Sequence, residues 1–194
     1  MDHESPSAGD LPACTVVLDV GHNPPAIAEL AKMLTRRFPN RPVRLVLGMS
    51  REKDLGESLK LALASPSLVH VHLVAAPHPR AAPVAELLEA AQVAVSTGTT
   101  AAPGRSDSTE EFFSVHDSVL GSVTSGLRAA VTAAAGSDEI VVVCGSVFIM
   151  AEAREALGFK DPRDAPYVND MATGSNTKSA DGNGHATASS PMGK

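Results

Sequence analysis

The chain has 194 residues, a hydrophobic fraction of 43% and a formal net charge of −6. This length suits one domain with a sizeable core and is too short for two full-sized domains with linkers. Because the negative charge comes without a cluster of Lys and Arg, the composition argues against a nucleic-acid partner.

The N-terminal residues 1–14 are predicted to be a disordered linker. They begin with the polar string MDHESPSAGD, which has neither the apolar stretch of a secretory signal nor the basic pattern of a transit peptide. No apolar run approaches the ~20 residues of a membrane span. Cys14 and Cys144 lie in apolar runs, as small buried thiols do. We therefore expect a monomeric cytoplasmic protein without a membrane partner, a mitochondrial location being open for a full-length parent.

Short apolar runs alternate with amphipathic stretches along the chain. The runs are continuously apolar, as in strands that are covered on both faces, and they predict strands at residues 15–20, 43–49, 69–76 and 140–146. Hydrophobic residues spaced three and four apart predict helices at 26–38, 54–64, 82–91, 118–135 and 147–157. A further short strand is predicted near 92–96.

Such alternation is typical of an α/β fold, with a Rossmann-like, open, mostly parallel sheet and helices on both faces. Ligands of such sheets bind at the carboxyl ends of the strands. The domain is predicted to span residues 15–160. Residues 97–115 lack periodicity and predict a loop insertion, and residues 161–194 are rich in Gly, Ser, Asn and Thr and predict a disordered tail.

The first predicted strand ends in a polar turn that contains Asp19, His22 and Asn23. Since a helix follows at once, these side chains lie where α/β sheets bind ligands and where the helix dipole favours anions. Alternatively, Asn23 caps the helix, Pro24 occupies its first turn, and Asp19 and His22 are turn residues without a function. The local pattern supports both interpretations equally.

Four strings resemble motifs of one family in the same order. VVLDVGHNPPA resembles the Asp-Val-Ala-His-Asn-Pro signature of folylpolyglutamate and dihydrofolate synthases, which belong to the Mur ligase superfamily. The strings LGMSREKD, APHPRA and CGSVF, the last followed by AEAR, resemble the turns after the second, third and last strands of the C-terminal domain. The resemblance covers about residues 15–158.

The resemblance implies a ligase that activates a pteroate or folate carboxylate with ATP and Mg²⁺, after which the amine of glutamate attacks the acyl phosphate. Asp19 corresponds to a nucleotide-contacting Asp, and His22 to a His that faces the reacting groups and the glutamate. Ser146 corresponds to a Ser of the glutamate site. Arg80 resembles, more loosely, an Arg that holds the carboxylate of the incoming amino acid, and it could equally be a solvated loop cation.

Two other groups of residues are interpreted as structural. Lys53 and Asp54 match the family's turn after the second strand, but a surface turn with Asp54 as a helix cap explains them as well. His70 and His72 share one face of the third strand, but the sequence places no carboxylate or Cys beside them, so a packed pair is favoured over a metal site. We predict no metal site.

The ATP chemistry of this family resides in an N-terminal domain with a G-x-x-x-x-G-K-[ST] loop, and the 194 residues contain no such string. We therefore expect ATP and Mg²⁺ to be held mainly by such a domain, in the same chain or in a separate one. The chain could be a fragment, a split subunit or a free-standing binding module without catalysis. An unrelated doubly wound nucleotide-binding domain is a fourth alternative.

Overall fold

The computed structural model describes residues 11–51, 55–97, 112–116 and 122–159. The predicted tail at 161–194 lies outside the described residues, as do Lys53, Asp54, most of the N-terminal linker and most of the loop at 97–115. The predictions for these undescribed residues stay untested.

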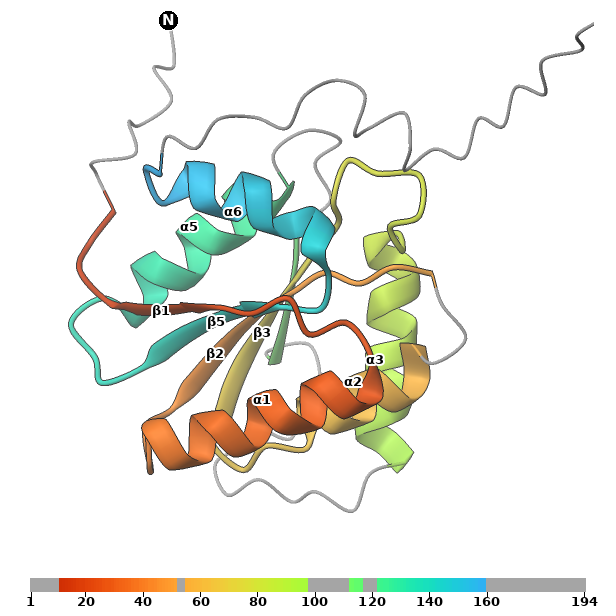
Figure 1. Ribbon diagram of the computed structural model, residues 1–194, viewed down its shortest axis with the longest axis horizontal. Coiled ribbons are helices and arrows are strands. Elements are labelled where there is room, and N and C mark those ends of the chain that lie inside the picture. Colours follow the sequence, from red (N-terminus) through yellow and green to blue (C-terminus); the bar gives the residue numbers. More distant parts are fainter. Residues whose placement is uncertain (1–10, 52–54, 98–111, 117–121, 160–194) are drawn as a thin grey trace, which may run out of the picture. The chain divides into compact units, whose positions relative to one another are not determined.

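One parallel sheet of five strands organises the described residues, and its strand order is β1-β5-β2-β3-β4. The strands are β1 (Thr15–Leu18), β2 (Val43–Leu47), β3 (Leu68–Val74), β4 (Phe113–His116) and β5 (Ile140–Cys144). The last strand in the sequence therefore lies between the first and the second (Figure 1). The predicted α/β class and the open parallel sheet are confirmed.

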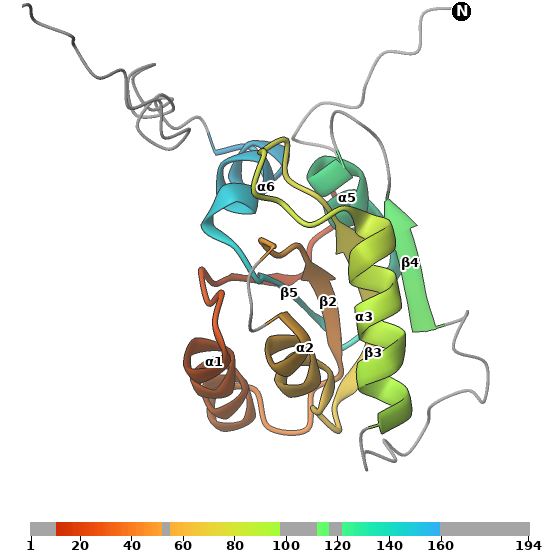
Figure 2. The ribbon, with the colours of Figure 1, turned by 90° about the vertical axis from the view of Figure 1, so that its right-hand side faces the viewer.

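Helices cover both faces of the sheet. One face is covered by α1 (Pro24–Arg37), α2 (Leu55–Leu63) and α3 (Val84–Thr97). Figure 2 shows α1 and α2 side by side below β5 and β2, and α3 to their right. The other face is covered by α5 (Ser122–Ala134), the short 3-10 helix η2 (Val147–Ile149) and α6 (Met150–Ala156). Among the described residues, no helix is both long and apolar enough to cross a membrane.

The strands are apolar on both faces because each face has its own core. In β5, Ile140, Val142 and Cys144 pack with the layer of α1–α3. Val141 and Val143 of the same strand pack with α5 and α6. The period of two in strand geometry sends successive side chains to opposite cores, so a continuously apolar strand is fully buried.

Two predictions about the middle of the chain are wrong. Residues 92–96 belong to helix α3, because Leu87, Ala91 and Ala94 are buried at helical spacing and override the strand preference of the neighbouring valines. The sequence LLEAAQVAVS therefore continues one helix. Part of the predicted loop at 97–115 is strand β4, whose buried Phe113 anchors it beside β3.

Gly145 allows the chain to turn sharply where β5 ends. Its φ is +105°, and a Cβ at this position would lie 2.6 Å from the carbonyl oxygen of Gly48. Gly48 is itself confined, since its Cβ would lie 2.9 Å from the carbonyl oxygen of Val74. The loops after β5, β2 and β3 therefore pack so closely that their backbones are in contact. Side chains at Gly145 and Gly48 would prevent this approach.

We expect Gly145→Ala to lower the free energy of unfolding by about 1–3 kcal/mol from backbone strain, with a further loss from the contact with Gly48. The matched control is Gly56→Ala in α2, where a Cβ meets nothing within 4 Å. The control should be neutral or stabilising by up to about 1 kcal/mol, because Ala favours a helix more than Gly does. Urea denaturation of both variants measures the difference, and equal effects would contradict the packing described above.

Candidate functional site

The turns after β1 and β5 lie side by side at the carboxyl edge of the sheet. The amide of Asp19 donates a hydrogen bond to the carbonyl oxygen of Val143 at 3.0 Å. The amide of Gly145 donates to the carbonyl oxygen of Gly21 at 2.9 Å. The structure thus brings the Asp19–His22 turn next to the turn that carries Ser146, although Gly21 and Gly145 are 124 positions apart in the sequence.

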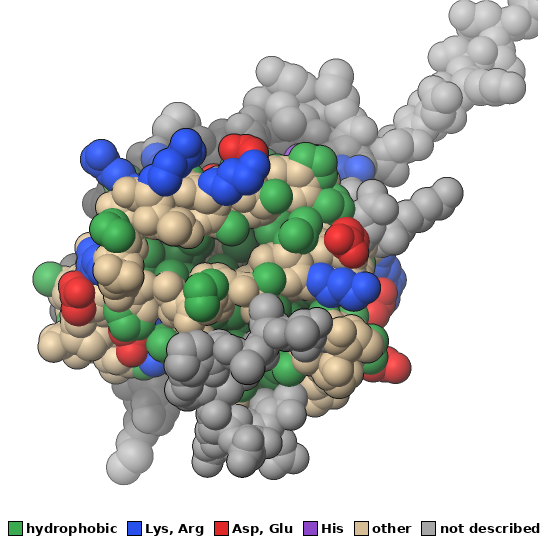
Figure 3. Space-filling model, turned by 90° about the horizontal axis from the view of Figure 1, so that it is seen from below, with side chains coloured by type: hydrophobic (Ala, Val, Ile, Leu, Met, Phe, Trp, Pro, Cys, Tyr) green, Lys and Arg blue, Asp and Glu red, His purple; other side chains and the backbone are tan. Residues whose placement is uncertain are grey.

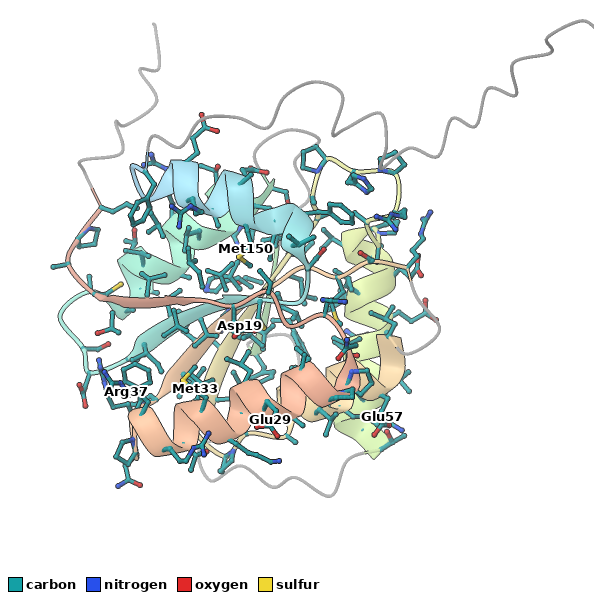
Figure 4. The ribbon with its side chains drawn as sticks, viewed as in Figure 1. Asp19, Glu29, Met33, Arg37, Glu57 and Met150 are labelled. Carbon is teal, nitrogen blue, oxygen red and sulfur yellow. The ribbon has the colours of Figure 1, made fainter. Side chains whose placement is uncertain are left out.

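The carboxylate of Asp19 is half-buried at the level of the sheet, between α1 and α6 (Figure 4). Its Oδ1 accepts a hydrogen bond from the amide of Gly21 at 2.7 Å, which holds the turn closed. Burial, and secondly the charge of Asp19, raise the pKa of the Cys144 thiol to about 12. Cys144 is therefore a protonated, packed thiol and is excluded as a nucleophile at neutral pH.

His22 is exposed on the same turn, and its ring is oriented by the backbone. Nδ1 lies 3.0 Å from the carbonyl oxygen of Val20, and since a carbonyl only accepts, Nδ1 must carry the hydrogen. In the neutral ring, Nε2 is then a free proton acceptor. The next residue, Asn23, accepts a hydrogen bond from the amide of Ala26 at 3.0 Å and caps α1, as the capping interpretation predicts. That cap uses neither Asp19 nor His22.

Ser146 is 3% exposed and caps the short helix η2. Its Oγ accepts a hydrogen bond from the amide of Phe148 at 3.2 Å. The hydroxyl can still donate its own hydrogen, so the cap does not exhaust its capacity for hydrogen bonds.

Arg80 reaches the same region from the loop after β3. Its guanidinium carbon lies 4.9 Å from the ring centroid of Phe148, two residues beyond Ser146. The ring of His78 stacks on Phe148 with 3.7 Å between centroids and 9° between planes. His78 Nδ1 also accepts a hydrogen bond from the amide of Arg80 at 3.2 Å. The guanidinium of Arg80 and the ring of His78 therefore both rest on Phe148. Burial, and secondly the charge of Arg80, lower the pKa of His78, which favours its neutral ring.

The backbone of Arg80 is fixed by the neighbouring loop after β2. Ser50 and Ala81 form an antiparallel bridge, and the amide of Arg51 donates to the carbonyl oxygen of Arg80 at 2.8 Å. Arg51 itself pairs with Glu86, whose carboxylate lies 3.1 Å away. Within the described part of the chain, no carboxylate forms an ion pair with Arg80. Its guanidinium is therefore held in place but is available to an anion.

Sequence reasoning gave no role to His78 and Phe148. The two residues are 70 positions apart, and their stacking depends on β5 lying inside the sheet. The only sequence signal was that each lies within a string that resembles a family motif.

A groove of about 420 Å³ runs from the Asp19 turn along α1 and is lined by Asp19, Gly21, His22, Leu30 and Met33, among others. A carboxylate in this position suits the hydroxyl groups of a nucleoside and repels phosphates. Across the described ranges, no group of three or more His, Cys, Asp or Glu residues could hold a metal ion.

The comparisons with known proteins agree with this fold. The family model described as "Mur ligase, glutamate ligase domain" matches residues 8–147. A comparison with curated protein sequences gives no match.

Among solved structures, folylpolyglutamate synthase from Mycobacterium tuberculosis, complexed with ADP and AMPPCP, superimposes with a TM-score of 0.60 at 24% identity, over 78% of this chain and 31% of that one. The bifunctional folylpolyglutamate/dihydrofolate synthase from Yersinia pestis, with AMPPNP and Mn, gives 0.55 at 22% identity, over 80% and 32%. The same Yersinia pestis enzyme with Mn, AMPPNP and L-glutamate bound gives 0.51 at 22%, over 80% and 32%.

At these identities the structural likeness concerns the fold. The chain spans about a third of the length of these relatives. The family match is more specific, because it covers well over half of the chain and includes the turns that carry Asp19, His22 and Arg80. On this basis the chain belongs to the Mur ligase family, as its glutamate ligase domain.

Proposed function

We propose that this chain is the C-terminal, glutamate-binding domain of an ATP-dependent ligase that joins L-glutamate to a pteroate or folate carboxylate. One observation carries the proposal: the available guanidinium of Arg80 rests on Phe148, two residues from Ser146, at the same sheet edge as His22. Membership of the glutamate ligase family supports it, and so does the L-glutamate bound in the Yersinia pestis relative.

In this reaction the acceptor carboxylate is first activated as an acyl phosphate, with the phosphate supplied by ATP. The amine of glutamate then attacks the acyl carbon, a C–N bond forms, and the bond to the phosphate oxygen breaks. The amine must lose a proton before or during the attack. His22 is suited to accept that proton at Nε2, since Nδ1–H is already committed to the carbonyl of Val20.

Arg80 and Ser146 are suited to hold the glutamate. A guanidinium donates two parallel hydrogen bonds to a carboxylate, and the aromatic support from Phe148 orients the fork before the ligand arrives. Ser146 can add its hydroxyl hydrogen. We assign to Asp19 a contact with a hydroxyl group of the nucleotide, on the grounds of its charge and its place in the α1 groove.

ATP and Mg²⁺ need further residues. We propose that these lie in an N-terminal P-loop domain, in the same chain or as a separate partner, and that no Mg²⁺ ligand comes from the described residues. The nucleotide analogues and Mn bound by relatives of which this chain covers about a third are consistent with such a division.

We expect the 194-residue chain alone to show no ATP hydrolysis and no ligation, and to support both when fused after a P-loop ligase domain. In the fusion, His22→Ala should lower kcat about 10²–10³-fold, the usual effect of losing a contact to the reacting groups. The measurement is glutamate-dependent ADP release with dihydropteroate or a folate as acceptor. An active chain without the second domain would overturn the proposed division of roles.

The matched control is Asn23→Ala. Loss of this helix cap should cost about 1 kcal/mol of stability with little change in kcat, whereas His22→Ala should leave stability within about 0.5 kcal/mol. If His22→Ala changed stability but not kcat, the turn would be a capping motif and not a catalytic one.

We expect Arg80→Ala to weaken the binding of L-glutamate roughly 10- to 100-fold, since hydrogen bonds between charged groups contribute about 1.5–3 kcal/mol. The control is Arg51→Ala, on the adjacent loop, whose exposed ion pair with Glu86 is lost without contact to the proposed ligand. Calorimetric titration of the fusion protein compares the two variants. Equal affinities would show that Arg80 is only a solvated cation.

A further inference from the structure

Three histidines of β3 and β4 form a cluster under α5, at the opposite side of the sheet from α1–α3. His72 Nδ1 lies 3.0 Å from His116 Nε2, and their rings stack at 5.3 Å. The ring centroid of His70 is 4.7 Å from that of His72, and its Nε2 lies 2.8 Å from Ser114 Oγ. We call His70, His72 and His116 the histidine cluster.

His72 is the buried centre of this cluster. It is 4% exposed, and its Nε2 is shielded from solvent without a hydrogen-bond partner. A charged imidazole in this position would lose its hydration and gain no partner in exchange. Burial first, and then the neighbouring His70, His116 and Arg44, lower the pKa of His72 from 6.5 to about 3. Burial lowers the pKa of His116 as well.

The charged groups around the cluster oppose its protonation. Arg44 of β2 is in register with His70, and both oxygens of Glu139 engage this arginine, at 2.7 and 3.3 Å. The carboxylate on this side is therefore already committed to a cation. From α5, the packed groups are the hydroxyls of Ser122 and Ser125, and Arg128 is the next charged residue, one turn beyond Ser125.

The cluster also ties together three parts of the fold. β4 is a four-residue edge strand whose partner in the sheet is β3 (Figure 2). The hydroxyl of Ser122, at the start of α5, donates to the carbonyl oxygen of His116 and accepts from the amide of Ala75 at 3.0 Å. Ala75 follows β3 directly and leads into the loop that carries Arg80. Release of β4 would therefore also loosen the start of α5 and the base of that loop.

We propose that the histidine cluster is an acid-sensitive latch, which holds β4 on β3 when its rings are neutral and releases β4 when the pH falls. An opened β4 exposes His72 and restores its ordinary affinity for protons, so the open state binds more protons than the closed state below about pH 6.5. The latch is fully closed above that pH. It weakens progressively as the pH falls toward about 3, the pKa of His72 in the closed state. The proposal is independent of the proposed ligase activity.

Hydrogen exchange of the 194-residue chain between about pH 7.5 and pH 4.5 tests this. After correction for the intrinsic pH dependence of exchange, the open population at β4 amides should rise about tenfold per pH unit below about pH 6.5 from His72 alone. Amides of β1 and β5, on the far side of β2, should not show this rise in the open population. An open population at β4 that tracks β1 and β5 at every pH would overturn the proposal.

His72→Asn tests the cluster directly, because Asn keeps a polar atom near the position of Nδ1 and takes up no proton. It should abolish the pH slope at β4, whereas His78→Asn, in the loop that stacks on Phe148, should leave the slope intact. If His72→Asn keeps the slope, the proposal is wrong. Should that variant fail to fold, ring NMR of His72 in the unmodified chain decides: titration near pH 6.5 with β4 still closed would equally overturn it.

Discussion

The close approach of three strand-end loops is the constraint on which the candidate site depends. Gly145, with its φ of +105°, passes over the carbonyl of Gly48 and donates a hydrogen bond to Gly21. This contact joins the turn after the first strand to the turn after the last, because β5 inserts between β1 and β2. Without such backbone packing, Ser146 and the Phe148 platform would not lie beside the His22 turn, and Arg80 would have no aromatic support.

The site combines rigid and exposed parts. Ser146 is buried and its segment is held by the η2 cap, whereas His22 is exposed and is oriented only by the carbonyl of Val20. This arrangement suits the proposed role, in which the domain positions an amino acid and residues of another domain complete the reaction. The groove along α1 provides further surface beside the Asp19 turn. Figure 3 shows the molecule from below, where hydrophobic side chains lie between basic and acidic ones.

The sequence was sufficient to predict the parallel α/β sheet, because each strand is apolar on both faces and the cores on the two sides demand that pattern. It was also sufficient to predict most of the helices. It failed at residues 92–96, where burial of Ala91 and Ala94 at helical spacing outweighed the strand preference of valine. It also missed β4, a strand too short to show a period. Motif order indicated Asp19, His22 and Ser146, whereas the His78–Phe148 stack and the His72–His116 contact join residues that are distant in the sequence and required the fold.

We propose that the carboxyl edge of the sheet binds glutamate, and amide chemical-shift mapping with L-glutamate tests this proposal most directly. We predict that the largest shifts fall on residues 19–23, 78–82 and 145–149. A different groove, of about 540 Å³ between α1 and α2, is lined by Ala28, Ala31 and Leu61, among others, and serves as the internal reference. Shifts concentrated at that groove, or none at the three turns at saturating glutamate, would contradict the account.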